Sequence, residues 1–275
     1  MNAFQLYLLG VVALIGCAEH RAEEHVARLG DTDRRVRLDA SYELVQLGSS
    51  SVEPILRAAQ NGSDRLQYVS VQILGRIGDA RAIPFLRDRA SASNIHIRRE
   101  AVIALGMMGE PGLLAPLAGI LIADGDRGVR SAAARGISNF LDTTAVPSLI
   151  SALRDREPEV RREALSSLNR LWTVAAEIAV IAALREDEDE TVRYIAAQAL
   201  GHHQATLALE ALKTATLEDS STWVRVEAVR ALGNIGDPRV TPELERVLRS
   251  YDGQEQEAAV EALQQLTGVD YVVIP

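Results

Sequence analysis

The sequence predicts an all-α protein built as an α-solenoid of about eight two-helix repeats. Three observations predict this fold. A pattern of about 31 residues recurs through most of the 275-residue chain, the apolar positions in each copy follow a helical period, and no stretch alternates with period two for long enough to form a sheet. A unit this short cannot bury its own apolar face, so the copies must stack on one another.

Each copy contains one strongly amphipathic segment, whose first apolar position we number 0. These positions are Val36, Leu66, Ile97, Val129, Val160, Val192, Val224 and Glu255. Position +4 holds Ala40, Ser70, Ala101, Ala133, Ala164, Ala196, Ala228 and Ala259. Position +8 holds Leu44, Leu74, Leu105, Ile137, Leu168, Leu200, Leu232 and Leu263. Seven alanines in eight at one phase exceed what composition alone would give, so these columns predict the buried stripe of one helix in each repeat, helix B.

A shorter apolar-periodic segment precedes each helix B and predicts a second helix, helix A. Examples are residues 82–90, 145–155 and 240–250. The first turn of several such segments holds a proline, where the missing N–H costs little: Pro54, Pro84, Pro147 and Pro242. Turn-forming residues at 77–80, 108–111 and 235–238 join one repeat to the next, so each repeat is predicted to be two antiparallel helices.

Two charged columns accompany the apolar ones. Position +1 is arginine in six of the eight repeats: Arg37, Arg98, Arg130, Arg161, Arg193 and Arg225. Position −5 is aspartate in five: Asp31, Asp124, Asp155, Asp187 and Asp219. With strings such as DETVRYIAAQALG (189–201), the chain resembles the HEAT-repeat family over residues 20–266, specifically the short bacterial type also found in phycobilin lyase subunits. The resemblance implies that these Asp and Arg side chains form ladders along the inter-repeat turns, and it says little about function.

The first residues are strongly apolar. Residues 3–16 are too few to span a bilayer core and have the length of a signal-peptide core. The junction Leu14-Ile15-Gly16-Cys17 resembles the lipobox of bacterial lipoproteins, and Cys17 is the only cysteine of the chain. We therefore expect a signal peptide at 1–16, a lipid on Cys17, and one solenoid domain over 17–275, anchored on the bacterial cell envelope, in the periplasm or outer membrane of a Gram-negative cell. No Lys or Arg precedes the apolar run, so an uncleaved anchor or a buried helix are the alternatives.

Several positions depart from the pattern. Gln67 replaces the arginine of the second repeat, and Glu255 opens the eighth repeat, about residues 238–266, which we expect to be a polar cap. Repeat five ends at 171–177 without glycine or proline, so its helices are expected to run on or bend differently. The apolar tail 269–275 is expected to fold back over the last helix pair, and a frayed tail is the alternative.

Charge and composition exclude some partners. A formal charge of −9 and a pI near 5.2 argue against nucleic-acid binding and against polybasic attachment to anionic lipid. Aromatic residues are only 4% of the chain, which gives no base-stacking platform.

Candidate catalytic and metal sites are few. Adjacent helical residues such as His202 and His203 project about 100° apart, so a structural role is expected for the pair rather than metal binding. The acidic run 186–190 suits a helix N-terminus and lacks the spacing of a calcium loop. The HEAT-like diiron hydroxylases carry His-Glu pairs, and no histidine here precedes a glutamate, so we expect no kinship with them. Neither a nucleophile with its base nor a phosphate loop is found, and we expect no cofactor, no metal and no catalysis.

The exposed face of the B helices remains as a candidate binding surface. In HEAT-like solenoids these helices line the concave side, and positions +2, +6 and +10 lie opposite the buried stripe. They gather residues suited to protein recognition and carboxylate contact, namely Arg76, Arg99, Arg135, Asn139, Arg162, Arg170, Tyr194, His202, Arg230 and Asn234. The expected partner is a protein with an acidic or C-terminal segment. An ordinary polar face, balanced by Glu100, Glu163 and Glu227, is the alternative.

These observations lead to one expected function and two rivals. We expect a non-enzymatic, lipid-anchored scaffold that binds a protein partner in its concave B-helix groove. The main rival is an accessory or lyase subunit of a cofactor-attachment enzyme, similar to the bilin lyases. A structural spacer without a defined partner is the third possibility.

Overall fold

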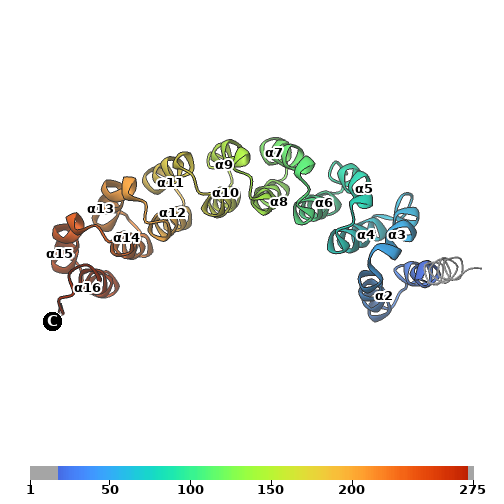
Figure 1. Ribbon diagram of the computed structural model, residues 1–275, viewed down its shortest axis with the longest axis horizontal. Helices are drawn as coiled ribbons and strands as arrows, with labels where there is room; N and C mark the ends of the chain where they lie inside the picture. Colours follow the sequence, from blue (N-terminus) through green and yellow to red (C-terminus); the bar gives the residue numbers. More distant parts are fainter. Residues whose placement is uncertain (1–17, 272–275) are drawn as a thin grey trace, which may run out of the picture. The chain divides into compact units, whose positions relative to one another are not determined.

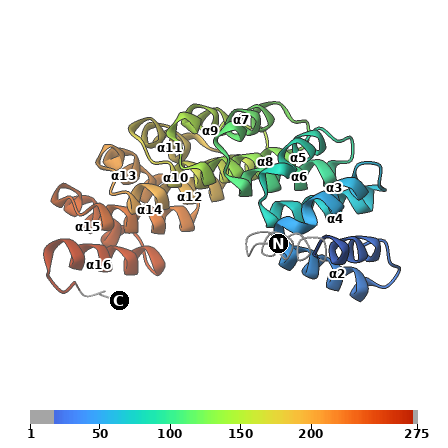
Figure 2. The same cartoon turned by 45° about the vertical axis from the view of Figure 1, so that its right-hand side comes forward.

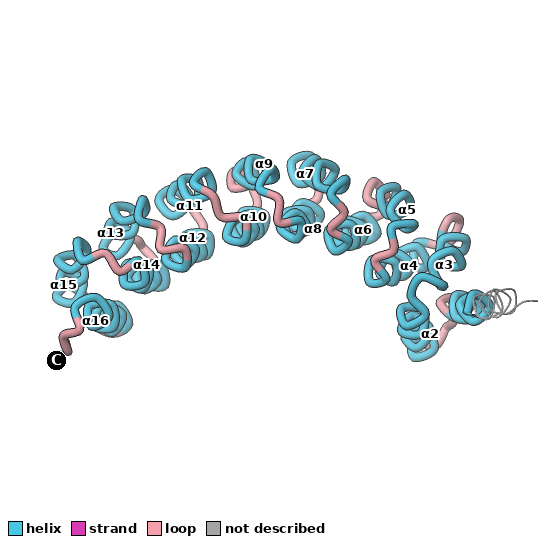
Figure 3. Tube along the Cα trace, in the orientation of Figure 1, coloured by secondary structure: helices cyan, strands magenta, loops and turns pink. Residues whose placement is uncertain are grey.

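The structure is a computed structural model that describes residues 18–271. These residues form helices joined by short turns, with no strand among them (Figures 1 and 3), which confirms the all-α prediction. Contacts divide the chain into two compact units, with the division between Phe140 and Leu141. Cys17 and residues 3–16 lie outside the described residues, so the lipid on Cys17 stays a prediction. In the described part of the chain, no helix has both the length and the apolar character needed to cross a bilayer.

The first unit contains four helix pairs. It begins with a helix whose described part covers residues 18–28. The following helices are α2 (Arg34–Leu47), α3 (Val52–Ala59), α4 (Asp64–Ile77), α5 (Ile83–Arg89), α6 (Ile95–Met108), α7 (Leu114–Ala123) and α8 (Arg127–Ile137). Even-numbered helices are the B helices, and within the unit they stack in one layer while the A helices form the other (Figure 2).

The second unit also contains four helix pairs in the same two layers. Its helices are α9 (Val146–Ala152), α10 (Pro158–Arg170), α11 (Val174–Glu186), α12 (Glu190–His202), α13 (Leu209–Glu218), α14 (Thr222–Ile235), α15 (Thr241–Ser250) and α16 (Gln254–Thr267). Helix α14 packs against both α12 and α16, so each B helix is covered by its neighbours in the stack.

The predicted core columns are buried throughout. The residues at +4 are completely buried in all eight repeats, and those at +8 are at most 1% exposed. Position 0 is buried from Ile97 onward and only half-buried at Val36 and Leu66. The periodicity therefore assigned the inward face of every B helix correctly.

Small residues let neighbouring B helices approach closely. A Cβ added at Gly106 would lie 2.5 Å from the Cα of Gly136, and one added at Gly201 would lie 2.7 Å from the Cα of Ala231. Gly75 and Gly233 occupy the same phase, +9, and would meet Ala104 and Ala262 at 2.6 and 2.9 Å. The +9 glycine thus faces a small residue at +7 of the next repeat, because any larger side chain would push the two helices apart.

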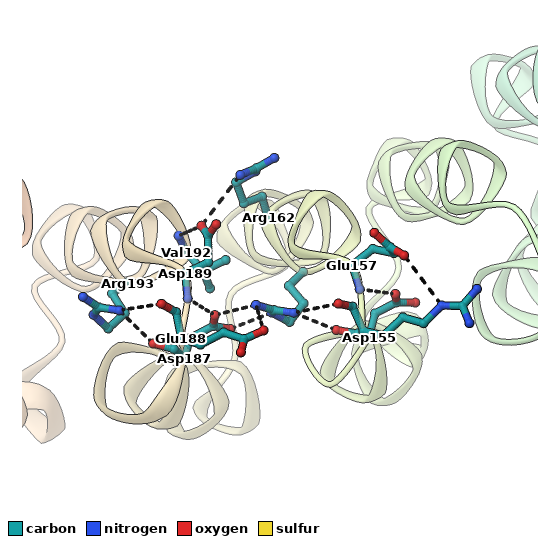
Figure 4. A network of polar contacts seen from close by, with 10 residues as sticks. Asp155, Glu157, Arg162, Asp187, Glu188, Asp189, Val192 and Arg193 are labelled. Carbon is teal, nitrogen blue, oxygen red and sulfur yellow. Dashed lines mark hydrogen bonds and ion pairs between the residues drawn. The ribbon is translucent and has the colours of Figure 1, made fainter.

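The arginine and aspartate columns form the ladder that the family resemblance implies (Figure 4). Arg161 donates to Asp187 at 2.8 Å, and Arg193 donates to Asp219 at 2.7 and 2.9 Å. Each arginine also donates from Nη1 to the backbone carbonyl at position −5 of its own repeat, as Arg193 does to Asp187 at 2.9 Å. The location differs from the expectation. These aspartates lie in the turn from helix A to helix B inside a repeat, and the arginine of the preceding repeat reaches across to them.

Two departures from the pattern are compensated within the ladder. Glu255 is buried rather than forming a wet cap, and its Oε1 accepts from Arg225 at 2.6 and 3.0 Å. The eighth repeat has no aspartate at −5, so Glu255 supplies the missing carboxylate. In the second repeat, Gln67 donates to the Gly62 carbonyl and accepts from Arg89 at 2.7 Å. A contact with the next repeat is therefore kept, but here the residue at position +1 is the acceptor instead of the donor.

Repeat five ends differently from the others, but its helices do not run on. Helix α10 stops at Arg170, and α11 begins two residues after Leu171–Trp172 with Thr173 as its N-cap, without the short 3₁₀ turn that precedes most other A helices. The last repeat is followed by residues 269–271, which form no regular structure; Gln264 donates to Asp270 at 2.7 Å. The rest of the tail lies outside the described residues.

Loss of one ladder carboxylate should destabilise the second unit. The side chains of Arg193 and Asp219 are 12% and 7% exposed, and Asp219→Asn would leave the guanidinium without its countercharge, at an expected cost of about 3 kcal/mol. Burial alone would raise the pKa of Asp219, but hydrogen bonds from Arg193 and the Ser221 amide and the nearby arginine charges hold it below its ordinary value. This stabilisation is present above the ordinary aspartate pKa and is lost as the pH falls below about 4.

Urea unfolding at pH 7 and pH 3, followed by tryptophan fluorescence, checks this expectation because both tryptophans lie in the second unit. Asp219→Asn should unfold at lower urea at pH 7 and lose less stability on acidification than the natural chain. Asp252→Asn, at an exposed carboxylate with no ion pair among the described residues, is the matched control. Equal behaviour of the two variants would contradict a stabilising role for the ladder.

Candidate functional site

In the first unit, the B-helix face carries exposed cations and exposed apolar side chains together. Arg76 and Arg99 are exposed, and neither forms an ion pair with another described residue. Arg135 and Asn139 are exposed on the last B helix of the unit, where Asn139 donates to the Gly106 carbonyl at 3.1 Å. These four predicted residues therefore lie on the face that the register assigned to them.

Large apolar residues occupy the same face, and the sequence-based list of site residues missed them. Leu38, Tyr42 and Met107 are 59%, 62% and 55% exposed, at positions +2, +6 and +10. Exposed Tyr and Met beside Arg is a composition typical of protein interfaces. The repeat register could have identified these three residues, because positions +2, +6 and +10 were already expected to face outward.

In the second unit, carboxylates of the chain itself engage part of the predicted arginine row. Arg162 lies 3.7 Å from Asp189 (Figure 4), and Arg230 lies 4.0 Å from Glu227. Tyr194 is half-buried and lies near the Glu227 carboxyl group. Arg170, His202 and Asn234 are exposed. The face is therefore a network of opposite charges rather than a continuous basic row.

Glu227 is the most buried carboxyl on this face. Burial raises its pKa above the ordinary glutamate value, against the opposing effects of the Arg230 charge and the Tyr194 hydroxyl. Burial, together with the charge of the nearby Glu227 carboxylate, raises the pKa of Tyr194.

The His202–His203 pair belongs to an aromatic cluster at the end of repeat five. The His203 ring stacks on Trp172 with centroids 4.0 Å apart and planes 7° apart, and its Nε2 lies 2.9 Å from the carbonyl oxygen and from Oδ1 of Asn169. Asn169 occupies the +9 phase that holds glycine in four other repeats. Burial lowers the pKa of His203, against the opposing hydrogen bond with Asn169, and His202 contacts it edge-on. Asn169 thus contacts His203 of the next repeat at a position where four other repeats have a glycine.

The described residues do not fit a diiron or other metal centre. Among residues 18–271, no group of three or more His, Cys, Asp or Glu side chains lies together in a way that could hold a metal ion. The acidic run 186–190 serves the helix terminus and the ladder, with Asp189 accepting from the Val192 amide at 3.0 Å as the N-cap of α12. We therefore derive no reaction step through a metal.

An apolar hollow in the second unit lies on the A helices. It has a volume of about 580 Å³ between α9 and α11, and its apolar lining includes Ile150, Leu153 and Ile178. Helix α11 leaves Val174 and Ile178 exposed beside it. Nothing in the structure indicates what would cover this surface.

Comparisons with known proteins place the chain in a family. A family model described as HEAT repeats matches residues 22–91, 52–138, 114–179 and 177–264, so the chain belongs to the HEAT-repeat family. Two solved structures share the fold: the X-ray structure of the Escherichia coli protein YibA (TM-score 0.64, 20% identity, 93% of this chain and 96% of that chain) and Kap95p bound to RanGDP (TM-score 0.66, 13% identity, 97% and 44%).

Curated relatives are more informative about the kind of protein. The chain is 29% identical to deoxyhypusine hydroxylase-B of Oryza sativa subsp. japonica over 234 residues, which cover 73% of this chain and 77% of the relative. It is 26% identical to deoxyhypusine hydroxylase of Arabidopsis thaliana over 223 residues, 78% and 68% of the two chains. It is also 28% identical to the bilin biosynthesis protein PecF of Nostoc sp. (strain PCC 7120) over 169 residues, 58% and 82%.

These relatives correct the expected function. The expected function was a non-enzymatic, lipid-anchored scaffold. The comparisons do not support it, because the relatives include hydroxylases and a bilin biosynthesis protein. The expectations of no catalysis and of no kinship with the hydroxylases were therefore wrong. The absence of His-Glu pairs tests only a few ligand positions, whereas the similarity is spread over most of the repeat scaffold.

Proposed function

We propose that this chain is the protein-recognition part of an enzyme that modifies another protein, and that its B-helix face holds that protein. The observation that carries the proposal is the face of the first unit. Exposed Tyr42 and Met107 lie there in the same layer as Arg76 and Arg99, two cations that form no ion pair with another described residue. Aromatic, Met and Arg side chains dominate the energy of many protein interfaces. The two guanidinium groups favour an acidic segment of the partner, because the planar fork of arginine matches a carboxylate.

The named relatives support the enzymatic part of the proposal. A hydroxylase and a bilin biosynthesis protein share this scaffold at 28–29% identity, and both names denote enzymatic processes. Among the described residues no group of His, Cys, Asp or Glu side chains suits a metal ion, which supports recognition as the contribution of this chain, with the reacting group supplied by another chain. This is the accessory-subunit alternative that the sequence left open.

Site-specific photo-crosslinking tests the recognition surface. We expect Met107→benzoylphenylalanine, on a B helix, to form a covalent adduct with the partner in cells. Ile122→benzoylphenylalanine is the matched control, because Ile122 is 60% exposed, is apolar and lies on helix A of the neighbouring repeat. Adducts from Ile122 alone would place the partner on the other layer and contradict the assignment.

The identity of the adduct and its modification state test the enzymatic role. We expect mass spectrometry to identify an enzyme subunit or a modified protein, and Arg99→Glu to lower the modified fraction of that protein at least about 10-fold, as for loss of an interface residue worth ~1.4 kcal/mol. Circular dichroism should show unchanged helicity, since Arg99 is exposed. An unchanged modified fraction in Arg99→Glu would refute the proposed role.

A further inference from the structure

Three residue types occur together at fixed positions of the repeat pattern. A carboxylate at −2, a tyrosine at +2 and an aromatic ring at −1 of the next repeat occur twice in the chain. The first set is Asp64, Tyr68 and His96, and the second is Glu190, Tyr194 and Trp223. In the other repeats, position +2 is never tyrosine and position −2 is never acidic. Their joint occurrence at two places therefore indicates two equivalent local surfaces rather than scattered surface residues.

The structure forms a hollow at both places. In the second unit, Glu190, Thr191, Tyr194 and Trp223 line a shallow open hollow of about 250 Å³ at the start of helices α12 and α14. In the first unit, the corresponding hollow of about 270 Å³ is lined by residues that include Asp64, Tyr68 and His96. We call the second-unit hollow the notch.

The ring of Trp223 is unusually open to solvent for its size. Its exposed fraction is 63%, although a tryptophan normally contributes its large surface to a core or an interface. Tyr194 beside it is half-buried and lies near the buried Glu227 carboxyl group. The notch thus presents two aromatic side chains, and a second carboxyl group, that of Glu227, lies near one of them.

The charges around the notch favour a cationic ligand. Each nearby arginine already has a carboxylate: Arg162 lies 3.7 Å from Asp189, Arg193 pairs with Asp219 at 2.7 Å, and Arg230 lies 4.0 Å from Glu227. Glu190 is exposed and forms no ion pair with any described residue. Aromatic faces attract cations through the ring quadrupole, and an adjacent carboxylate adds to that attraction.

We propose that the notch binds a cationic side chain, arginine or lysine, of the protein partner, between the rings of Tyr194 and Trp223 and against the Glu190 carboxylate. This inference rests on the proposed function for the existence of a protein partner, but the chemistry of the notch can be tested without that partner. The partner would then carry a cationic side chain that binds the notch, in addition to the acidic segment proposed to bind Arg76 and Arg99.

The first-unit hollow provides an internal comparison. There Asn94 already donates to the Asp64 carboxylate at 2.8 Å, and Arg65 lines the same hollow. Its carboxylate is therefore partly satisfied and a cation of the chain lies beside it. We assign the cation-binding role to the notch alone for this reason.

The test is a titration of the full chain with N-acetyl-arginine amide, followed by the two indole N–H signals in a ¹H–¹⁵N spectrum. We expect a saturable shift of the Trp223 signal with a dissociation constant of about 1–10 mM and no shift of Trp172. N-acetyl-citrulline amide, which has nearly the same shape without the charge, should bind about 5-fold to 30-fold more weakly. Glu190→Gln should weaken arginine binding about 3-fold, as for one exposed ion pair.

Glu186→Gln is the matched control, because Glu186 is exposed, belongs to the same acidic run and gives the same change of net charge. Equal binding of the citrulline compound, or equal weakening by the two glutamine variants, would overturn the proposal. If arginine binds at the notch but Met107 forms no crosslinks, cation binding at the notch is supported and the proposed function is refuted. If Met107 forms crosslinks but arginine does not bind, the proposed function is supported and cation binding at the notch is refuted.

Discussion

Gly106→Val is expected to destabilise the first unit by about 3 kcal/mol or more. Gly106 lies at phase +9 of α6, where an added Cβ would be 2.5 Å from the Cα of Gly136 on α8. The obstacle is backbone rather than the end of a flexible side chain, so the two helices would have to separate. The branched valine adds two further methyl groups to a contact that already lacks room for one carbon. Urea unfolding followed by far-ultraviolet circular dichroism should show loss of helix at lower denaturant, with faster amide exchange in α6 and α8.

The matched control is a glycine in the same unit that faces open space. Gly119 lies in α7, and no heavy atom is within 4 Å of a Cβ built on it. Gly119→Ala should be neutral or stabilise the chain by about 0.5–1 kcal/mol, because alanine loses less backbone entropy in a helix. A small, equal effect of both substitutions would show that the B helices can separate freely and that the +9 glycines do not set their spacing.

The repeat register predicted the fold well because burial in a stacked helix layer is periodic. Ala196 and Leu200 face the neighbouring helices for the same reason as Ala228 and Leu232, so one phase assignment determined the core of all eight repeats. Glycine at +9 was visible in the sequence as well. Its purpose became clear only when the structure showed the +7 residue of the next repeat opposite each one.

Side-chain pairing across repeats was less predictable. Glu255 was expected to be a wet cap, yet it is buried against Arg225, because a carboxylate one turn away can replace the missing aspartate. Gln67 and Arg89 reverse the usual donor and acceptor for a similar reason. Such exchanges depend on distances between neighbouring turns, which a residue pattern does not contain.

The candidate site was predicted in part. The outward phase of Arg76 and Arg99 followed from the register, whereas the pairing of Arg162 and Arg230 with Asp189 and Glu227 did not. The sequence did not indicate the enzyme kinship, because it contains no compact set of reactive groups. In this family the similarity to hydroxylases resides in the repeat scaffold, and the scaffold alone says little about which chain of an assembly holds the reacting group.

Leu200→Ala is expected to cost about 2–5 kcal/mol and to act locally within the second unit. Leu200 is completely buried at phase +8 of α12, which packs on α10, α11 and α14. Truncation leaves a cavity between these helices, and rigid neighbours can only partly collapse into it. In a stacked array each repeat is stabilised mainly by its neighbours, so the loss should appear as faster amide hydrogen exchange in α10 to α14.

Gln198→Ala is the control on the same helix, because Gln198 is exposed two residues away and should change stability by no more than about 0.5 kcal/mol. In Leu200→Ala, amides of α2 and α4 in the first unit should exchange at the rates of the natural chain. Uniform acceleration in every helix would mean that the repeats unfold as one cooperative block. The nearest-neighbour account of this solenoid would then be wrong, whatever the size of the stability loss.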